Sequence, residues 1–342
     1  MRKKVLVAMS GGVDSSVAAA LLLKQGFEVA GITMRVINST KGNETVTEAG
    51  LVADKLGIEH HVVDAVEFFR DNIIEYFVNE YLSGSTPNPC ICCNRKLKFG
   101  LLLNKAVQLG FDLFATGHYA IVKDGYLYRG ADPRKDQSYF LYPVYNCDRS
   151  RILFPLGNMT KDKVRMLGEQ YGLHNAKKEE SQDICFISTG DYIEFLKQNC
   201  AKEFLPGPVL DIRGKIIGKH DGIQNFTVGQ RKGLGALGRP MYVKKILPHD
   251  NAVVAATDDE LMASEVCIKE TLFIDSLDMS RSYSVQVRYR SQAVPCWLEN
   301  LNGQRMKIHF NKPVRAIAPG QSAVIYDGNL VVGAGIICSD DQ

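Results

Sequence analysis

The feature that most constrains the fold is a glycine- and serine-rich loop, Ser10-Gly11-Gly12-Val13-Asp14-Ser15-Ser16. It follows the short apolar run Lys4–Met9, which is typical of a buried strand. The alanine- and leucine-rich run Ser15–Gln25 comes next and stops at Gly26, as a helix does. Glycines let the backbone approach a phosphate, and a helix N-terminus directs amides and a positive dipole end toward it. The loop therefore predicts a phosphate site.

Strand and helix signals alternate through the first half of the chain. Strands are expected at Lys4–Met9, Glu28–Thr33, His61–Ala65 and Phe111–Ala115. Helices are expected at Ser15–Gln25, Val46–Leu56, the stretch ending at Tyr81, and Lys96–Leu109. This alternation predicts an α/β fold, a doubly wound parallel sheet with helices on both faces.

The pattern changes after Cys200, where glycine and proline become frequent and helical periods disappear. Short alternating strands are expected at Ser284–Tyr289, Arg305–Phe310, Ser322–Tyr326 and Leu330–Ile336, with turn pairs Asn302-Gly303 and Asp327-Gly328 between them. This pattern predicts a small barrel or sandwich. We expect three domains: a catalytic α/β domain over 1–198, a glycine-rich central domain over 199–258, and a C-terminal β-barrel-like domain over 259–342.

Composition and charge exclude few classes of function. The net charge of +3 is weakly basic, so a polyanionic partner must be met by local patches. No apolar run reaches the length that crosses a bilayer, so we expect a cytoplasmic protein without membrane association. A cytosolic chain keeps most thiols reduced, and its disulfides are more often catalytic than structural.

Three of the nine cysteines fall within four residues, in Thr86-Pro87-Asn88-Pro89-Cys90-Ile91-Cys92-Cys93. The two prolines predict a rigid loop with a helix that begins near Cys93. That position, beside Arg95 and Lys96, predicts a lowered thiol pKa at Cys93. A further cysteine, Cys185, lies in the short apolar stretch Ile184–Ile187.

The phosphate loop lacks the Gly-Lys-Ser/Thr ending of a Walker loop and the glycine spacing of a dinucleotide fingerprint. It resembles the PP-loop of the ATP pyrophosphatase superfamily, which implies ATP cleavage between the α and β phosphates and adenylation of a substrate oxygen. Asp14 can cap the helix or hold Mg²⁺. The alternative is a tight turn with a helix cap. We expect nucleotide contacts from Ala8, Met9, Ser10, Gly11, Gly12, Val13, Asp14, Ser15, Ser16, Met34 and Gly117, the last two because they follow the second and fourth strands.

Together these motifs resemble the tRNA-specific 2-thiouridylase family, MnmA, over almost the whole chain. Further matches are Asp136-Gln137-Ser138-Tyr139-Phe140-Leu141 and Phe226–Gly235. The resemblance implies that Cys93 is the nucleophile and that Cys185 carries a persulfide, so that sulfur transfer leaves a Cys93–Cys185 disulfide. The implied reaction uses ATP and Mg²⁺ to adenylate the C2 carbonyl oxygen of the wobble uridine of tRNA, and then replaces that oxygen with sulfur. The implied sulfur donor is a persulfide relay protein or a cysteine desulfurase.

The resemblance also implies tRNA contacts from Asn88, Pro89, Cys90, His118, Lys135, Asp136, Gln137, Arg288, Tyr289 and Gln321. A structural hydrogen bond is the alternative for His118, and a solvated strand face is the alternative for Arg288 and Arg290. The chain departs from the family where Asn88-Pro89-Cys90 replaces Asn-Pro-Asp, in a short segment over Val36–Glu44, and in the extra thiols Cys90 and Cys92.

Three other functions fit parts of the pattern. A PP-loop ligase or synthetase would need no paired cysteines. A metal- or iron–sulfur-dependent thiolation enzyme would use Cys90, Cys92, Cys93 and Cys185 as ligands, although the C-x-C-C spacing fits neither common zinc nor ferredoxin patterns. A non-catalytic RNA-binding module would not turn over ATP.

Overall fold

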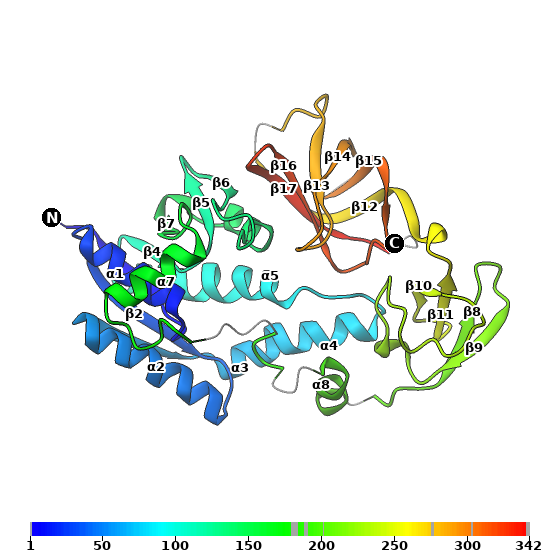
Figure 1. Cartoon of the computed structure of the whole chain (residues 1–342), viewed down its shortest axis with the longest axis horizontal. Coiled ribbons are helices and arrows are strands. Elements are labelled where there is room, and N and C mark those ends of the chain that lie inside the picture. Colours follow the sequence, from blue (N-terminus) through cyan, green and yellow to red (C-terminus); the bar gives the residue numbers. More distant parts are fainter. Residues whose placement is uncertain are drawn as a thin grey trace. The chain divides into compact units, whose positions relative to one another are not determined.

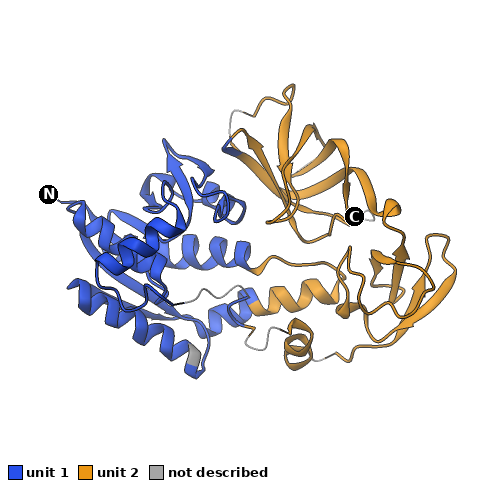
Figure 2. Cartoon of the chain, viewed as in Figure 1, with its two compact units in different colours: residues 1–73, 90–186, 329–331 blue, residues 74–89, 187–328, 332–342 orange. Residues whose placement is uncertain are grey.

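The structure, a computed structural model, describes residues 2–178, 184–187, 191–200, 202–274, 277–301 and 304–339, without the side chain of Lys41. The chain forms two compact units (Figure 2). Unit 1 comprises residues 1–73, 90–186 and 329–331, and unit 2 comprises residues 74–89, 187–328 and 332–342. None of the helices described is long and apolar enough to span a membrane.

Unit 1 is built on a five-stranded sheet in the order β3-β2-β1-β4-β7. Its strands are β1 (Lys4–Ala8), β2 (Glu28–Arg35), β3 (Glu59–Asp64), β4 (Leu113–Thr116) and β7 (Ile152–Leu153), and each adjacent pair is parallel. The parallel sheet that strand–helix alternation predicts is therefore confirmed. The strand order reverses beside β1, which creates a crevice at the carboxyl ends of β1 and β4.

Helices cover both faces of this sheet, because successive strand residues point to opposite sides. On one side, Val5, Val7 and Ala115 share a core with α1 (Val13–Lys24), α2 (Thr40–Leu56) and α7 (Lys161–Gln170). On the other side, Phe114 packs edge-on against Phe99, with ring centroids 6.3 Å apart. The arrangement is doubly wound, as predicted.

The remaining elements of unit 1 lie between β3 and β7 in the chain. They are α3 (Val66–Phe69), the π-helical turn η1 (Arg70–Ile74), and one continuous helical stretch made of α5 (Pro89–Cys93), the π-helical η2 (Asn94–Leu102) and α6 (Leu103–Gln108). A hairpin of β5 (Ala120–Lys123) and β6 (Tyr126–Arg129) follows β4. Three 3-10 turns lie between Ser138 and Arg151.

Unit 2 contains a helix pair and a four-stranded sheet, shown in cyan to yellow in Figure 1. Aromatic contacts join α4 (Glu75–Leu82) to α8 (Tyr192–Asn199): Phe77 lies edge-on to Phe195, and Tyr81 stacks on Tyr192 with centroids 4.9 Å apart. The sheet order is β10-β11-β8-β9, with β8 (Gly207–Leu210), β9 (Ile216–His220), β10 (Tyr242–Leu247) and β11 (Ala252–Ala256).

A closed six-stranded barrel ends the chain. Its strands are β12 (Met262–Phe273), β13 (Tyr283–Gln286), β14 (Val294–Asn300), β15 (Arg305–Arg315), β16 (Ser322–Asp327) and β17 (Leu330–Ile337). They run in the order β12-β15-β14-β13-β16-β17, and pairing of β12 with β17 closes the ring. Closure removes exposed sheet edges, and the barrel alternative is confirmed over the sandwich.

Several predicted boundaries are wrong for identifiable reasons. The second helix begins at Thr40 rather than Val46, because Ser39 caps it by accepting a hydrogen bond from the Gly42 amide. The strand predicted to continue to Tyr289 ends at Gln286, because Arg288 and Ser291 close a turn through their backbones. The turn pair Asn302-Gly303 lies outside the described residues.

Candidate functional site

The glycine loop joins β1 to α1 in the geometry of an anion site. The loop bends at Gly11, which adopts φ +69°, and Gly12 is the N-cap of α1. A Cβ at Gly11 would lie 2.8 Å from the Cβ of Glu48, so both space and conformation demand glycine. The first amides of a helix have no partner within it, and here they follow a loop with no bulky side chain. The geometry suits a phosphate group.

Side chains of the loop brace its own backbone. Ser15 Oγ accepts a hydrogen bond from the Ser10 amide at 3.2 Å and donates to the Gly12 carbonyl at 3.1 Å. Ser16 Oγ also donates to Gly12, at 2.9 Å. Asn175, which sequence reasoning missed, donates from Nδ2 to the Gly11 carbonyl at 2.8 Å. The loop is therefore held in shape before any ligand binds.

Asp14 is tied to residues far away in the sequence. Its Oδ1 accepts hydrogen bonds from Tyr119 Oη and Lys161 Nζ, both at 2.7 Å. Lys161 is only 4% exposed, so this ion pair is largely shielded from water. Gly12 caps α1 without a side-chain hydrogen bond, so the capping role considered for Asp14 is wrong. Lys161 was missed because only the fold brings it to the loop.

The loop after β4 presses directly on the phosphate loop. A Cβ at Gly117 would lie 2.7 Å from the Ser15 amide nitrogen and 2.8 Å from the Asp14 carbonyl carbon. The two loops therefore meet at the strand-order reversal, where nucleotides bind in this class of fold. Met34 does not follow the second strand as predicted, because β2 continues to Arg35 and Met34 pairs with Val63.

The other residues expected to contact the nucleotide differ in which of their atoms can reach a ligand. Ala8 is the last residue of β1. The side chains of Met9 and Val13 are buried in the core of the sheet, so these residues can reach a ligand only through their backbones. Ser10 is exposed, with its side chain available beside the loop.

The three clustered cysteines lie inside a helix rather than before it. The helix begins at Pro89, because proline has a helical φ and lacks only an amide that the first turn leaves unpaired. Cys93 is therefore one turn further along than predicted. Burial raises the pKa of Cys93 to about 12, although the Lys98 charge partly offsets this effect. The predicted lowering of its pKa is wrong.

The cation that acts on Cys93 is Lys98, not Arg95 or Lys96. Residues 94–102 are π-helical, and a π-helix bonds residue i to i+5, which is the spacing of Cys93 and Lys98. Sequence reasoning on the α-helical period missed Lys98 for this reason. The Lys96 ammonium instead donates to Asn72 Oδ1 at 3.1 Å.

Lys98 is held by a buried histidine. Lys98 Nζ lies 3.1 Å from His118 Nε2, and Thr116 Oγ1 lies 2.7 Å from His118 Nδ1. Burial, and then the Lys98 charge, hold the pKa of His118 well below its ordinary value. A neutral ring that accepts from Lys98 must carry its proton on Nδ1 and donate to Thr116. Both ring nitrogens are engaged, which favours the structural alternative for His118 over a tRNA contact.

Cys185 lies close to the cysteine helix. After burial and Lys98, its thiol is the next influence on the pKa of Cys93, and it raises it. Phe186 packs edge-on against Phe69 at 5.5 Å, and Cys92 Sγ donates to the Asn72 carbonyl at 3.5 Å. Phe186, the neighbour of Cys185, and the cysteine helix therefore both contact the segment Phe69–Asn72. Cys185 is exposed, and residues Glu179–Asp183 of its motif lie outside the described part of the chain.

Several residues expected to bind tRNA have internal partners. Asp136 accepts from Arg129, from the Gly130 and Ser138 amides, and from Ser138 Oγ. Gln137 Oε1 accepts from the Tyr119 amide at 3.0 Å. These bonds fix the loop after the β5–β6 hairpin. Lys135, in the same loop, is half-buried.

The candidates of unit 2 also brace the fold. Gln321 Nε2 donates to the Thr86 and Pro87 carbonyls, immediately before Asn88 and Pro89. Arg288 donates to the Val228 and Ala316 carbonyls. Arg288 and Tyr289 lie in the turn after β13, so a solvated strand face does not describe them.

The metal-binding side chains among the described residues do not form a metal centre. Among the described residues, which include all nine cysteines, no group of three or more His, Cys, Asp and Glu side chains is arranged to hold a metal ion. The iron–sulfur alternative for Cys90, Cys92, Cys93 and Cys185 therefore finds no support. A Mg²⁺ ion held mainly by ATP phosphates and water needs only one carboxylate, and Asp14 at the loop fits that requirement.

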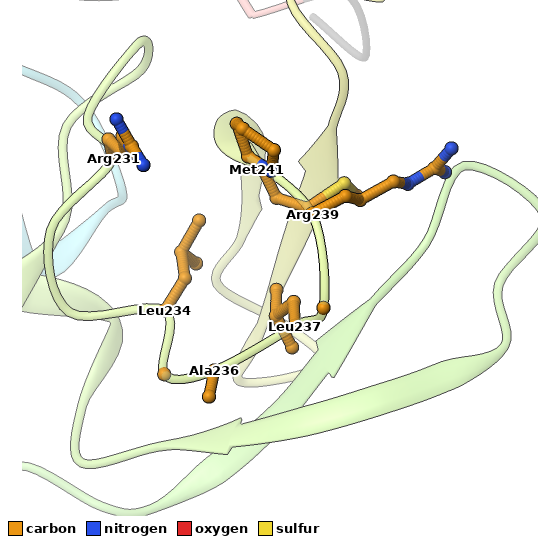
Figure 3. A pocket seen from close by; sticks show the side chains of 9 residues that line it. Arg231, Leu234, Ala236, Leu237, Arg239 and Met241 are labelled. Atoms are coloured by element: carbon orange, nitrogen blue, oxygen red, sulfur yellow. The ribbon is translucent and has the colours of Figure 1, made fainter.

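A separate cavity lies in unit 2, within the glycine-rich segment Arg231–Met241 (Figure 3). Its volume is about 340 Å³. Arg231 and Arg239 flank it, with Leu234, Leu237 and Met241 between them. None of the cysteines and none of the phosphate-loop residues line this cavity.

Comparisons with known proteins agree over the full chain. Three family profiles match in order: the tRNA methyl transferase HUP domain (residues 3–189), the tRNA methyl transferase PRC-barrel domain (193–257) and the aminomethyltransferase beta-barrel domain (263–337). A tRNA-specific 2-thiouridylase MnmA from Acetivibrio thermocellus is 44% identical over 98% of this chain and 99% of its own length. The MnmA of Carboxydothermus hydrogenoformans is 45% identical over 98% of both chains.

Solved structures match more weakly. A 4-thiouridine synthetase–RNA complex with bound ATP aligns at a TM-score of 0.38 and 18% identity, over 58% of this chain and 50% of its own. A TM-score this low carries no argument, so the assignment rests on the full-length relatives. The chain belongs to the MnmA family of tRNA-specific 2-thiouridylases.

Proposed function

We propose that this protein is a tRNA-uridine 2-sulfurtransferase. It uses ATP to adenylate the C2 carbonyl oxygen of the wobble uridine of tRNA and replaces that oxygen with sulfur from a cysteine persulfide, releasing AMP and pyrophosphate. The observation that carries this proposal is that the segments of Cys93 and Cys185 both contact the stretch Phe69–Asn72, in the same unit as the phosphate loop. The names of the full-length relatives support the substrate.

The phosphate loop binds ATP in this proposal. Its amides and the N-terminus of α1 hold the phosphates, while Gly11 and Gly117 keep the approach free of side chains. Lys161 fixes Asp14 at the loop. Mg²⁺, when bound with ATP at Asp14, would neutralise the pyrophosphate that departs. Adenylation is needed because a carbonyl oxygen is a poor leaving group and AMP is a good one.

Sulfur transfer then requires both cysteines. The terminal sulfur of a Cys185 persulfide attacks C2 directly, or the Cys93 thiolate attacks the inner sulfur of the persulfide and releases hydrosulfide, which attacks C2. In the first route AMP leaves, and the Cys93 thiolate then attacks Cys185 Sγ and frees the sulfur bound to C2. In either route the S–S bond of the persulfide breaks and a Cys93–Cys185 disulfide forms. Lys98 is the group that favours the Cys93 thiolate, because its charge lowers a pKa that burial raises. A dithiol must then reduce the disulfide.

The remaining roles are proposed on the same basis. The tRNA contacts come from Asn88, Pro89, Cys90, Lys135, Asp136, Gln137, Arg288, Tyr289 and Gln321, of which Asp136, Gln137, Arg288 and Gln321 also support their own loops. His118 is assigned the structural role of holding Lys98. A persulfide relay protein or cysteine desulfurase loads Cys185 in the cytoplasm. Domain limits of 1–198, 199–258 and 259–342 are consistent with the three family profiles.

The test is mass spectrometry of tRNA nucleosides after incubation of the protein with ATP, Mg²⁺, tRNA and a persulfide donor. We expect 2-thiouridine from the wild type, none from Cys93→Ser or Cys185→Ser, and wild-type levels from Cys147→Ser, which changes a half-buried thiol outside the cluster. ATP turnover that survives in both cysteine variants, with no 2-thiouridine from the wild type, would point to a PP-loop ligase. Absence of ATP turnover with tRNA would point to an RNA-binding module.

A further inference from the structure

Cys90 and Cys93 form a C-x-x-C pair in the first turns of a helix. Both lie in α5, three residues apart and therefore on one face of the helix. Helix geometry places their Cα atoms about 5 Å apart, and disulfides form between Cα atoms about 4.4–6.8 Å apart. Cys90 is exposed, whereas Cys93 is half-buried. The spacing therefore allows a disulfide between Cys90 and Cys93.

A third thiol, that of Cys185, interacts electrostatically with this pair. Although residue Cys90 as a whole is exposed, burial is the largest cause of the raised pKa of its thiol, and Cys185 is the next. Cys185 also raises the pKa of Cys93. Cys90 acts on Cys93 in the same way. Phe186, next to Cys185, packs on Phe69, and Cys92 on the cysteine helix bonds to Asn72, so the segment of Cys185 and the helix that carries Cys90 and Cys93 meet at the same turn.

Cys92 differs from its neighbours on the helix. Its Sγ donates to the Asn72 carbonyl at 3.5 Å. Cys92 lies only one residue from Cys93, so its side chain projects from a different face of the helix. The chain thus offers its own control thiol within the same turn.

We propose that Cys90 is a resolving thiol, which forms a disulfide with Cys93 and so releases Cys185 from the Cys93–Cys185 disulfide left by sulfur transfer. The origin of that disulfide rests on the proposed function. The relay itself depends only on the three thiols.

The chemistry balances in two exchanges. The Cys90 thiolate attacks Cys93 Sγ, so the Cys90–Cys93 bond forms, the Cys93–Cys185 bond breaks, and Cys185 leaves as a thiolate that takes up a proton. A dithiol reductant then attacks the Cys90 sulfur and leaves as its own disulfide, which supplies two electrons and returns Cys90 and Cys93 to thiols. Cys185 is free for a new persulfide before the pair on the helix is reduced.

The test follows the thiols without tRNA, on the full-length protein. Wild type, Cys90→Ser and the control Cys92→Ser are oxidised with diamide, then mixed with about 0.1 mM dithiothreitol, and free Cys185 is captured over time with isotope-labelled iodoacetamide. An intramolecular thiol acts at an effective concentration of millimolar order, so release should be at least about tenfold slower in Cys90→Ser than in wild type. Cys92→Ser should match wild type, and its peptides should contain the Cys90–Cys93 disulfide.

Equal release from Cys90→Ser and wild type would overturn the proposal, as would a failure to detect Cys90–Cys93 peptides in Cys92→Ser. Circular dichroism checks that each variant is folded. The 2-thiouridine assay on the same preparations distinguishes a failure of the thiol relay from a failure of the proposed function. If relay kinetics appear but no 2-thiouridine forms, the proposed function fails while the thiol relay stands.

Discussion

Replacement of Gly117 by alanine tests whether the loop after β4 sets the shape of the phosphate site. The new Cβ would lie 2.7 Å from the Ser15 amide nitrogen and 2.8 Å from the Asp14 carbonyl carbon, both backbone atoms that cannot swing aside. An ordinary contact begins at 3.4 Å, so the phosphate loop must move by roughly 0.7 Å. Misplacement of about 1 Å can cost 100-fold in rate, so we expect kcat/KM for ATP to fall about 10- to 100-fold. Overpacking should also lower the free energy of unfolding by about 1–3 kcal/mol.

The assay is tRNA-dependent pyrophosphate release as a function of ATP concentration, together with urea unfolding followed by circular dichroism. Gly50→Ala is the matched control, because a Cβ at Gly50 in α2 meets its nearest neighbour, His60 Nδ1, at an ordinary 3.7 Å. We expect it to keep full activity and to gain up to about 1 kcal/mol, since alanine favours a helix over glycine. Unchanged KM and stability in Gly117→Ala would refute the proposed contact between the two loops.

Two further predictions concern thiols. Lys98→Met removes the charge that lowers the pKa of Cys93. Alkylation of Cys93 by iodoacetamide at pH 9 should therefore slow about three- to tenfold, which corresponds to a pKa rise of about half to one unit. The control Lys96→Met should be alkylated at the wild-type rate, and equal rates in Lys98→Met and wild type would contradict the role of Lys98. Burial raises the pKa of Cys296 to about 12 from 9.0, so above pH 9 only the unfolded state loses this proton and stability falls as pH rises. Between pH 8 and pH 10.5 the free energy of unfolding of the wild type should fall by about 2 kcal/mol more than that of Cys296→Ala. Urea unfolding followed by the fluorescence of the only tryptophan, Trp297, measures this difference. Parallel pH profiles of the two proteins would exclude the effect.

The parallel sheet and its phosphate loop could be predicted because their signals are local. Apolar runs of strand length, a helix stop at Gly26 and the paired glycines Gly11 and Gly12 each act within a few residues of chain. Their arrangement follows from the rules of parallel sheets. The same local signals located the barrel, although they missed β12, where exposed and half-buried residues break the alternation. They also missed β14, whose burial alternates but whose sequence does not, because the apolar Trp297 lies on the exposed face.

The electrostatic environment of the site could not be predicted, because it depends on partners brought together by folding. Lys161 reaches Asp14 across 147 residues. Burial beside Phe99 and Phe154, together with the Lys98 charge, lowers the pKa of His118. The π-helical stretch changes which side chains share a face, so Lys98 replaced the expected Arg95 and Lys96. A thiol beside several basic residues in sequence thus has a raised pKa in the fold.

The path of the chain between its two units has a consequence for biosynthesis. Residues 74–89 belong to unit 2, although both flanking stretches belong to unit 1, and unit 1 receives its last residues, 329–331, near the end of the chain. As the polypeptide leaves the ribosome, the apolar face of α4 with Phe77 and Tyr81 must wait more than a hundred residues for its partners Phe195 and Tyr192. Until then that helix is a natural binding site for a chaperone, and a truncation at residue 186 would leave it permanently uncovered.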